Sequence, residues 1–162
     1  MTFNANPSLI FFAVLIAVAL LKVSAARAED ISLASCPVPV QETIQKNLHG
    51  GVLDEVKFIS VAGRILYVAE VDLPGGRDLK VHVGRDGGLI KTREEITLAE
   101  VPAAVVTAAQ KLVPEGGKID DVDRETANGT VTYRIEIDRP LTRELKLHFA
   151  ADGTVLNQRE DS

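Results

Sequence analysis

Two histidines occupy matching places in this chain, each two residues after a lysine. His82 follows Lys80, and His148 follows Lys146. Just upstream of each, YVAEVD (67–72) and YRIEID (133–138) carry two acids at alternate positions. Neighbouring strands that bring histidines and carboxylates to one face could bind a metal ion or a pH-sensitive partner. The plainer interpretation is cross-strand pairing of lysine and histidine with acids on a solvated sheet, worth roughly 0.2–1 kcal/mol per pair.

We favour the plainer interpretation, because both copies would otherwise need the same ligand. The side chains on this predicted exposed sheet face are nevertheless the best candidates for binding a partner. They are Glu70, Asp72, Lys80, His82, Glu136, Asp138, Lys146 and His148. We predict no metal ligand set, no cofactor and no catalytic residue among them.

Other motifs give weaker signals. The acidic run from Asp120 to Glu125 lacks the glycine that a calcium loop requires. Asn128-Gly129-Thr130 fits a glycosylation sequon, but Asn-Gly is also a strong hairpin signal. The sequence has one cysteine, no CxxC or HExxH motif, and no recognisable Ser-His-Asp arrangement. We therefore expect a protein that is not an enzyme.

Composition narrows the classes of partner. The chain has 162 residues, a net charge of −5 and no basic run, so nucleic acid is a poor candidate. Tryptophan is absent and aromatic residues make up 4% of the chain. That content is low for a site that stacks on sugars or bases.

The first residues have the pattern of an export signal. Leu9 to Leu21 is an apolar run shorter than the ~20 residues that span a membrane. The small residues of Ala26-Arg27-Ala28 favour cleavage after Ala28, which makes 1–28 a signal peptide. Cleavage at Ala25-Ala26 and an uncleaved anchor are the alternatives. Leu33-Ala34-Ser35-Cys36 has the residue types of a lipobox but lies too far from the apolar run.

The rest of the chain contains one pattern written twice. With a single one-residue gap among glycines, 31–95 aligns with the following segment, 96–161, and 23 of 65 positions are identical. Cys36 falls opposite Val101, which favours a small buried apolar position over a nucleophile or a lipid anchor. We therefore expect two repeats, 31–95 and 96–161.

Each repeat reads as an extended lead, a helix and an antiparallel meander. A helical stripe recurs at Val40, Ile44 and Leu48, and clean alternation follows in the strands. Alternation of this kind is typical of a sheet covered on one face. The predicted fold is α+β, with two tandem repeats that each pack one helix on a four-stranded antiparallel sheet. We expect the repeats to pair edge strands and share one core, with both helices on one face, after an N-terminal signal-peptide helix.

One segment carries a family resemblance. The pattern I-x-L-x-x-V-P…K-I-x-x-V…G-x-x-x-Y-x-I-x-I…L-x-L-x-x-x-A-D-G-x-V-L over 96–156 resembles the PepSY-like family, also described as β-lactamase-inhibitor-like (BLIP-like). The resemblance implies an exported bacterial protein with paired helix-plus-sheet units and an interaction or inhibitor role. The inhibitor that lends its name to the fold binds through a sheet face rich in aromatics. Here only four aromatic residues follow the signal, and three are predicted to point inward, which argues against β-lactamase inhibition.

These observations together predict an exported, non-catalytic module in the periplasm or secreted. We expect its partner to be a protein or peptide of the cell envelope that engages the polar sheet face or a free sheet edge. We expect no contact with nucleic acid, and none with the membrane once the signal is removed. The alternative function is a periplasmic sensor that binds a metal ion or small ligand through the His/Glu/Asp face.

Overall fold

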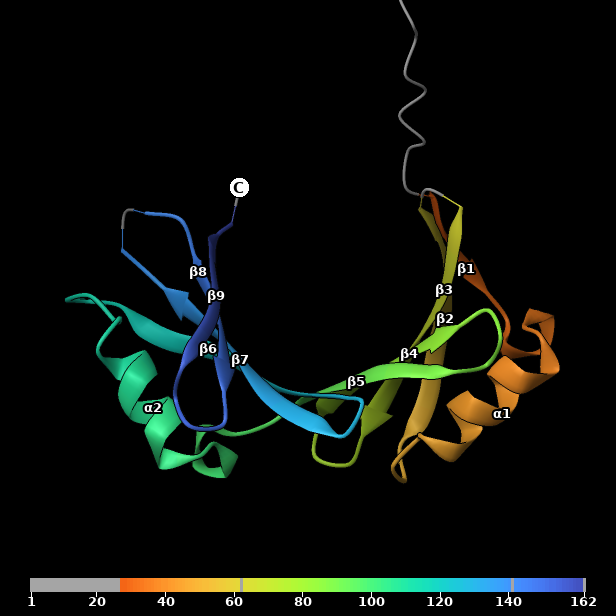
Figure 1. The fold of residues 1–162 in the computed structure, drawn as a ribbon, viewed down its shortest axis with the longest axis horizontal. Coiled ribbons are helices and arrows are strands. Elements are labelled where there is room, and N and C mark those ends of the chain that lie inside the picture. Colours follow the sequence, from red (N-terminus) through yellow and green to blue (C-terminus); the bar gives the residue numbers. More distant parts are fainter. Residues whose placement is uncertain (1–26, 62, 141, 162) are drawn as a thin grey trace, which may run out of the picture.

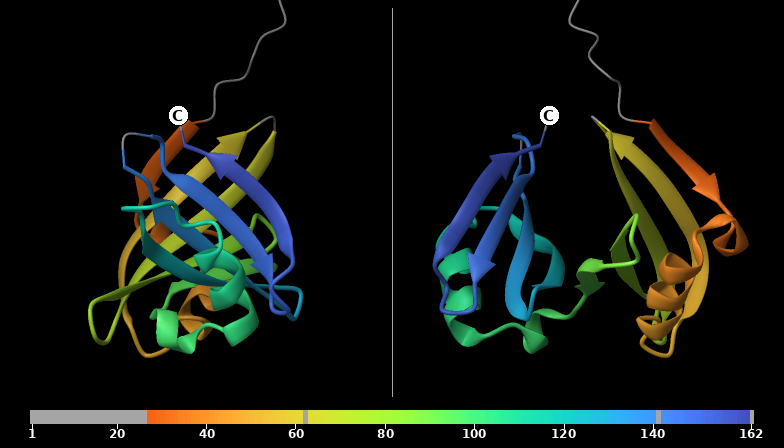
Figure 2. Two further views of the ribbon diagram at one scale, coloured as in Figure 1. Left: turned by 90° about the vertical axis from the view of Figure 1, so that its left-hand side faces the viewer. Right: turned by 45° about the vertical axis from the view of Figure 1, so that its right-hand side comes forward.

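The computed structural model describes residues 27–61, 63–140 and 142–161. Nine strands form one antiparallel sheet in chain order, with two short α-helices and two single-turn 3-10 helices, Leu33–Ser35 and Leu98–Glu100. Figures 1 and 2 show the sheet bent so that its two arms rise on either side, with both α-helices on the outer, convex side. The bounds are β1 Arg27–Ile31, α1 Val38–Lys46, β2 Val52–Val61, β3 Arg64–Leu73, β4 Arg77–Gly84, β5 Leu89–Glu95, α2 Ala103–Gln110, β6 Lys118–Ala127, β7 Thr130–Asp138, β8 Leu145–Ala150 and β9 Val155–Glu160.

The predicted fold class is wrong. The molecule is mostly β, and it is not built from two units of one helix on a four-stranded sheet. The expected pairing of edge strands between the two halves is present, because β5 pairs with β4 on one side and with β6 on the other, and this unbroken pairing merges both halves into one nine-stranded sheet within the described residues. The segment before α1 also forms a strand, β1, which pairs with β2 from Arg27 to Ile31. This strand was not predicted, because Arg27 and Ala28 were assigned to the signal peptide and Ile31 to the extended lead of the first repeat.

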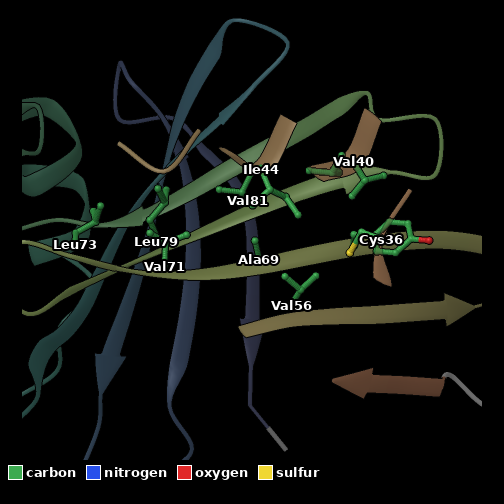
Figure 3. Close-up of a cluster of buried hydrophobic side chains, with 11 residues drawn as sticks. Cys36, Val40, Ile44, Val56, Ala69, Val71, Leu73, Leu79 and Val81 are labelled. Carbon is green, nitrogen blue, oxygen red and sulfur yellow. The ribbon is translucent and has the colours of Figure 1, made fainter. Parts of the chain in front are cut away.

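The expected shared core is also wrong, because the buried side chains form two separate clusters. One lies under α1 and includes Cys36, Val40 and Ile44 (Figure 3). The other lies under α2 and includes Val105 and Ala109. The sheet contributes alternating residues to each cluster, such as Leu79, Val81 and Val83 in the first and Leu145, Leu147 and Phe149 in the second.

A row of charged side chains separates the two clusters on the convex side. Leu79 of the first cluster stands opposite Glu94, Glu94 opposite Arg124, and Arg124 opposite Tyr133 of the second cluster. The Arg124 guanidinium lies 2.9 Å from a Glu94 carboxylate oxygen, and Arg77 lies 3.8 Å from the same carboxylate group. Because these paired charges occupy positions that would otherwise be core, neither helix can bury an apolar surface across the middle of the sheet.

The turns set where the helices lie. Asn128 and Gly129 have φ values of 51° and 76°, so they form the predicted two-residue hairpin between β6 and β7. Gly87 and Gly153, at φ 85° and 88°, lie under the starts of the two helices. A Cβ on Gly153 would stand 2.7 Å from the carbonyl oxygen of Ala104, so this turn and α2 approach each other as closely as backbone allows.

The predicted signal peptide falls on 1–28, of which 1–26 lie outside the described residues. Cleavage after Ala28 would cut within β1 and leave Glu29–Ile31 of the strand. Within the described part of the chain, no helix has the length and apolar content needed to cross a membrane.

Candidate functional site

The side of the sheet away from the helices is the candidate site, and we call it the concave face (Figure 1). Strand alternation places all eight predicted side chains there, because the residues between them, such as Ala69 and Val71, are buried under the helices. The face is less open than expected. Only Asp72 and Asp138 are exposed; the other six predicted residues are half-buried.

Glu70 holds two lysines on the first arm of the sheet. Its Oε1 accepts hydrogen bonds from Lys57 Nζ at 3.0 Å and Lys80 Nζ at 3.2 Å, and Lys80 stands directly opposite Glu70 in the ladder. Burial would raise the pKa of Glu70, but the two lysine hydrogen bonds outweigh it, so the pKa lies below its usual value. Asp72 forms no ion pair with any described residue, and it stands opposite Asp78 rather than a lysine.

Lys146 plays the corresponding part on the second arm. Its Nζ lies 3.0 Å from Asp161 and 3.1 Å from Glu136, and hydrogen bonds to these two acids raise its pKa. The neighbouring carboxyl group of Glu136 raises the pKa of Glu144. Asp138 pairs with Lys118 at 3.4 Å. The predicted lysine–acid pairing is therefore present in both arms.

The histidines do not pair with these acids. Burial, with Lys91 and Arg93 nearby, lowers the pKa of His82 to about 4. Its Nε2 is buried and has no hydrogen-bond partner among the described residues. On the second arm, His148 Nε2 lies 2.7 Å from Thr132 Oγ1, and burial lowers the pKa of His148 as well. Within the ranges the structure covers, no three His, Cys, Asp or Glu side chains converge in a way that could hold a metal ion.

The ion pairs across the centre of the concave face were missed by the sequence analysis. Lys91 Nζ of β5 lies 2.8 Å from Glu125 Oε2 of β6, and Arg93 lies 3.6 Å from Asp123. Glu125 is 8% exposed; burial would raise its pKa, but the hydrogen bond from Lys91 outweighs that effect and lowers it. A signal for them was available, because Asp121, Asp123 and Glu125 alternate with other side chains at the period of a strand.

Two hollows open on this side of the sheet. An apolar hollow of about 910 Å³ on the first arm is lined mainly by aliphatic side chains with two arginines: Ile59, Val61, Gly63, Arg64, Ile65, Leu66, Arg85 and Ile90. A cationic hollow of about 100 Å³ on the second arm is lined by Arg134, Lys146, Leu147, His148, Asn157 and Arg159. Four of these last six side chains are basic.

Aromatic side chains take no part in this face. Tyr67, Tyr133 and Phe149 are buried on the helix side, and Phe58 packs against the first cluster with its ring 5.6 Å from that of Tyr67. The described part of the concave face therefore presents charged, polar and aliphatic groups.

No protein family matches the sequence, and no curated protein matches it either. The structure does resemble solved ones. A DUF2874 family protein from Bacteroides uniformis is 23% identical, with a TM-score of 0.63 over 77% of this chain and 89% of that one. A Bacteroides eggerthii protein provisionally described as periplasmic is 23% identical, with a TM-score of 0.61 over 77% and 88%. A BLIP-like protein from Bacteroides fragilis is 18% identical, with a TM-score of 0.59 over 77% and 86%.

These similarities establish the class of fold. The chain has a BLIP-like fold, in which a bent antiparallel sheet carries its helices on the convex side. At these levels of identity the likeness extends to fold and not to partner or activity.

Proposed function

We propose that this chain is an exported, non-catalytic PepSY-like binding protein whose partner is a protein or peptide of the cell envelope. The partner binds the concave face of the sheet or one of its free edges. The observation that carries the proposal is this face itself: a surface of charged, polar and aliphatic groups, left uncovered by both helices, on which most charges are already held by cross-strand partners. A surface organised in this way loses little side-chain freedom when a partner binds.

Export and a periplasmic or secreted location belong to the same proposal. They are supported by the apolar run and Ala26-Arg27-Ala28 of the sequence, and by the fold shared with a protein provisionally described as periplasmic. The absence of aromatic anchors from the described concave face distinguishes the proposed binding from β-lactamase inhibition.

The test is affinity capture from the cell envelope with matched surface variants. Ile90 is 46% exposed in the apolar hollow, and Val38 is 64% exposed on α1. Ile90→Glu on the first arm, or Arg159→Glu at the β9 edge, should lose a partner that wild type and Val38→Glu both retain. A partner retained by both Ile90→Glu and Arg159→Glu and lost with Val38→Glu would place binding on the helix side and contradict the proposal. Failure of wild type to retain any protein after cross-linking would also contradict it.

A further inference from the structure

β5 and β9 occupy equivalent places in the aligned halves, but only β5 has a neighbour on its outer side. On β5, Arg93 stands opposite Lys80 and Lys91 stands opposite His82 of β4. On β9, Arg159 stands opposite Lys146 and Asn157 stands opposite His148 of β8, so the two strands have the same register. Beyond β5 lies β6, whereas β9 ends the sheet and all six of its residues are exposed. An edge strand with unpaired backbone groups is a template for another strand.

The neighbour of β5 indicates what β9 lacks. On the concave face, β6 brings Asp123 to within 3.6 Å of Arg93 and Glu125 to within 2.8 Å of Lys91. Arg159 has no ion pair with any residue that the structure describes. Arg134, which lines the same hollow from β7, stands opposite Asp123 of β6 and lies near enough to Asp123 and Glu125 to favour their ionised forms, so its charge already has acidic neighbours. Among the described residues, Arg159 at the β9 edge therefore lacks the adjacent acidic strand that β6 supplies to Arg93.

We propose that β9 accepts an extended acidic segment of the partner as a tenth, antiparallel strand, with carboxylates at alternate positions beside Arg159 and Asn157 at the outer side of the cationic hollow. This inference rests on the proposed binding function and names the edge and the chemistry of the partner. Main-chain hydrogen bonds supply sequence-independent affinity in such strand addition, and the side chains at every second position supply specificity.

A second copy of this chain fits the edge less well. The edge of a second copy other than β9 is β1, which is five residues long and places Asp30 and Ala28 on the concave face, opposite Lys57 and Ile59. It thus offers one carboxylate where β6 offers two. A segment of a different protein, with two acids in an i, i+2 relation, matches the hollow better.

The test uses β6 itself as the probe. A capped peptide with the sequence KIDDVDRETA, identical to 118–127, is titrated into the 15N-labelled protein, and amide shifts are followed because they register weak binding. The control peptide, KIDDVNRQTA, has amides in place of the carboxylates that correspond to Asp123 and Glu125. We expect amide shifts centred on β9 and β8. The dissociation constant should be about fivefold larger for the control peptide, because it cannot form the part-exposed ion pairs.

Variants of the protein localise the effect. Arg159→Gln should weaken binding of the acidic peptide about fivefold and leave the affinity for the control peptide unchanged. Lys46→Gln, which removes an exposed cation from α1, should change neither. Equal binding of both peptides would overturn the acidic chemistry, and the absence of shifts in β9 would overturn strand addition. Dimerisation through β9, seen by sedimentation, would replace the partner with a second copy. Because the titration needs no natural partner, these failures are separate from failure of the capture experiment.

Discussion

His82 should make the stability of this protein depend on pH in a definite window. In an unfolded chain histidine titrates near pH 6.5, whereas burial and the cations of β5 lower the pKa of His82 in the folded protein to about 4. Between these values the unfolded state binds more protons than the folded state. The free energy of unfolding therefore falls as the pH is lowered from about 6.5 to 4.

The size of the effect follows from the shift. A change from 6.5 to about 4 corresponds to about 3 kcal/mol, which the folded protein loses relative to the unfolded chain as the pH falls from 6.5 to 4. His82→Phe retains a ring of similar size and removes both the titration and the unpartnered buried nitrogen. At pH 8 the variant should be as stable as wild type to within about 1 kcal/mol, or more stable.

The assay is urea unfolding at constant ionic strength from pH 4 to 8, for wild type and His82→Phe. The difference between the two curves isolates His82 from the carboxylates and from His148, which titrate in both proteins. We expect the variant to gain about 3 kcal/mol relative to wild type between pH 6.5 and 4. An NMR titration of the His82 ring should give a midpoint near 4. Parallel stability curves, or a ring midpoint above 6, would refute the reasoning.

Three further predictions test other parts of the structure. Gly153→Ala should destabilise the protein by about 2 kcal/mol or more in thermal unfolding, because Gly153 has a positive φ and its backbone contacts α2. Gly129→Ala, at a similar φ but with open space around it, should cost about 1 kcal/mol, and equal losses for the two variants would contradict the contact with α2. Glu125→Gln should lower the free energy of unfolding by about 1–3 kcal/mol, with a coupling to Lys91→Met in a double-mutant cycle; zero coupling would contradict the pair at the centre of the sheet. Mass spectrometry of the exported protein should give an N-terminus directly after Ala28, and a mass that includes the apolar run would instead show an anchor.

Local features of the fold were predictable, because they depend on neighbours in the sequence. The alternation in 67–72 and 133–138 placed the strands with the correct face inward, and Asn128-Gly129 located a hairpin. The lysine–acid pairs followed from the same alternation, because Glu70 and Lys80 fall in register once the turn between β3 and β4 is set at Pro74-Gly75-Gly76.

Long-range features were not predictable in the same way. Nothing local marks β5 as a strand with two partners, since its pairing with β6 spans the whole of α2. In the sequence, Glu94 and Arg124 have the pattern of solvated charges. In the structure they pair across β5 and β6 and separate the two buried clusters. His82 is half-buried and lies near the charges of Lys91 and Arg93 on the next strand, whereas its alternation alone indicated an exposed residue.

A partner that binds the concave face at the free edge of β9 should lie within reach of the side chains of that strand. Site-specific photo-cross-linking in the producing cell tests this expectation most directly, with the photoreactive residue at Asn157 on β9 or at Val38 on α1. We expect a defined adduct from the photoreactive residue at Asn157, with a cross-linked segment that is acidic and extended, and no adduct from the residue at Val38. An adduct from Val38 with none from Asn157 would contradict it.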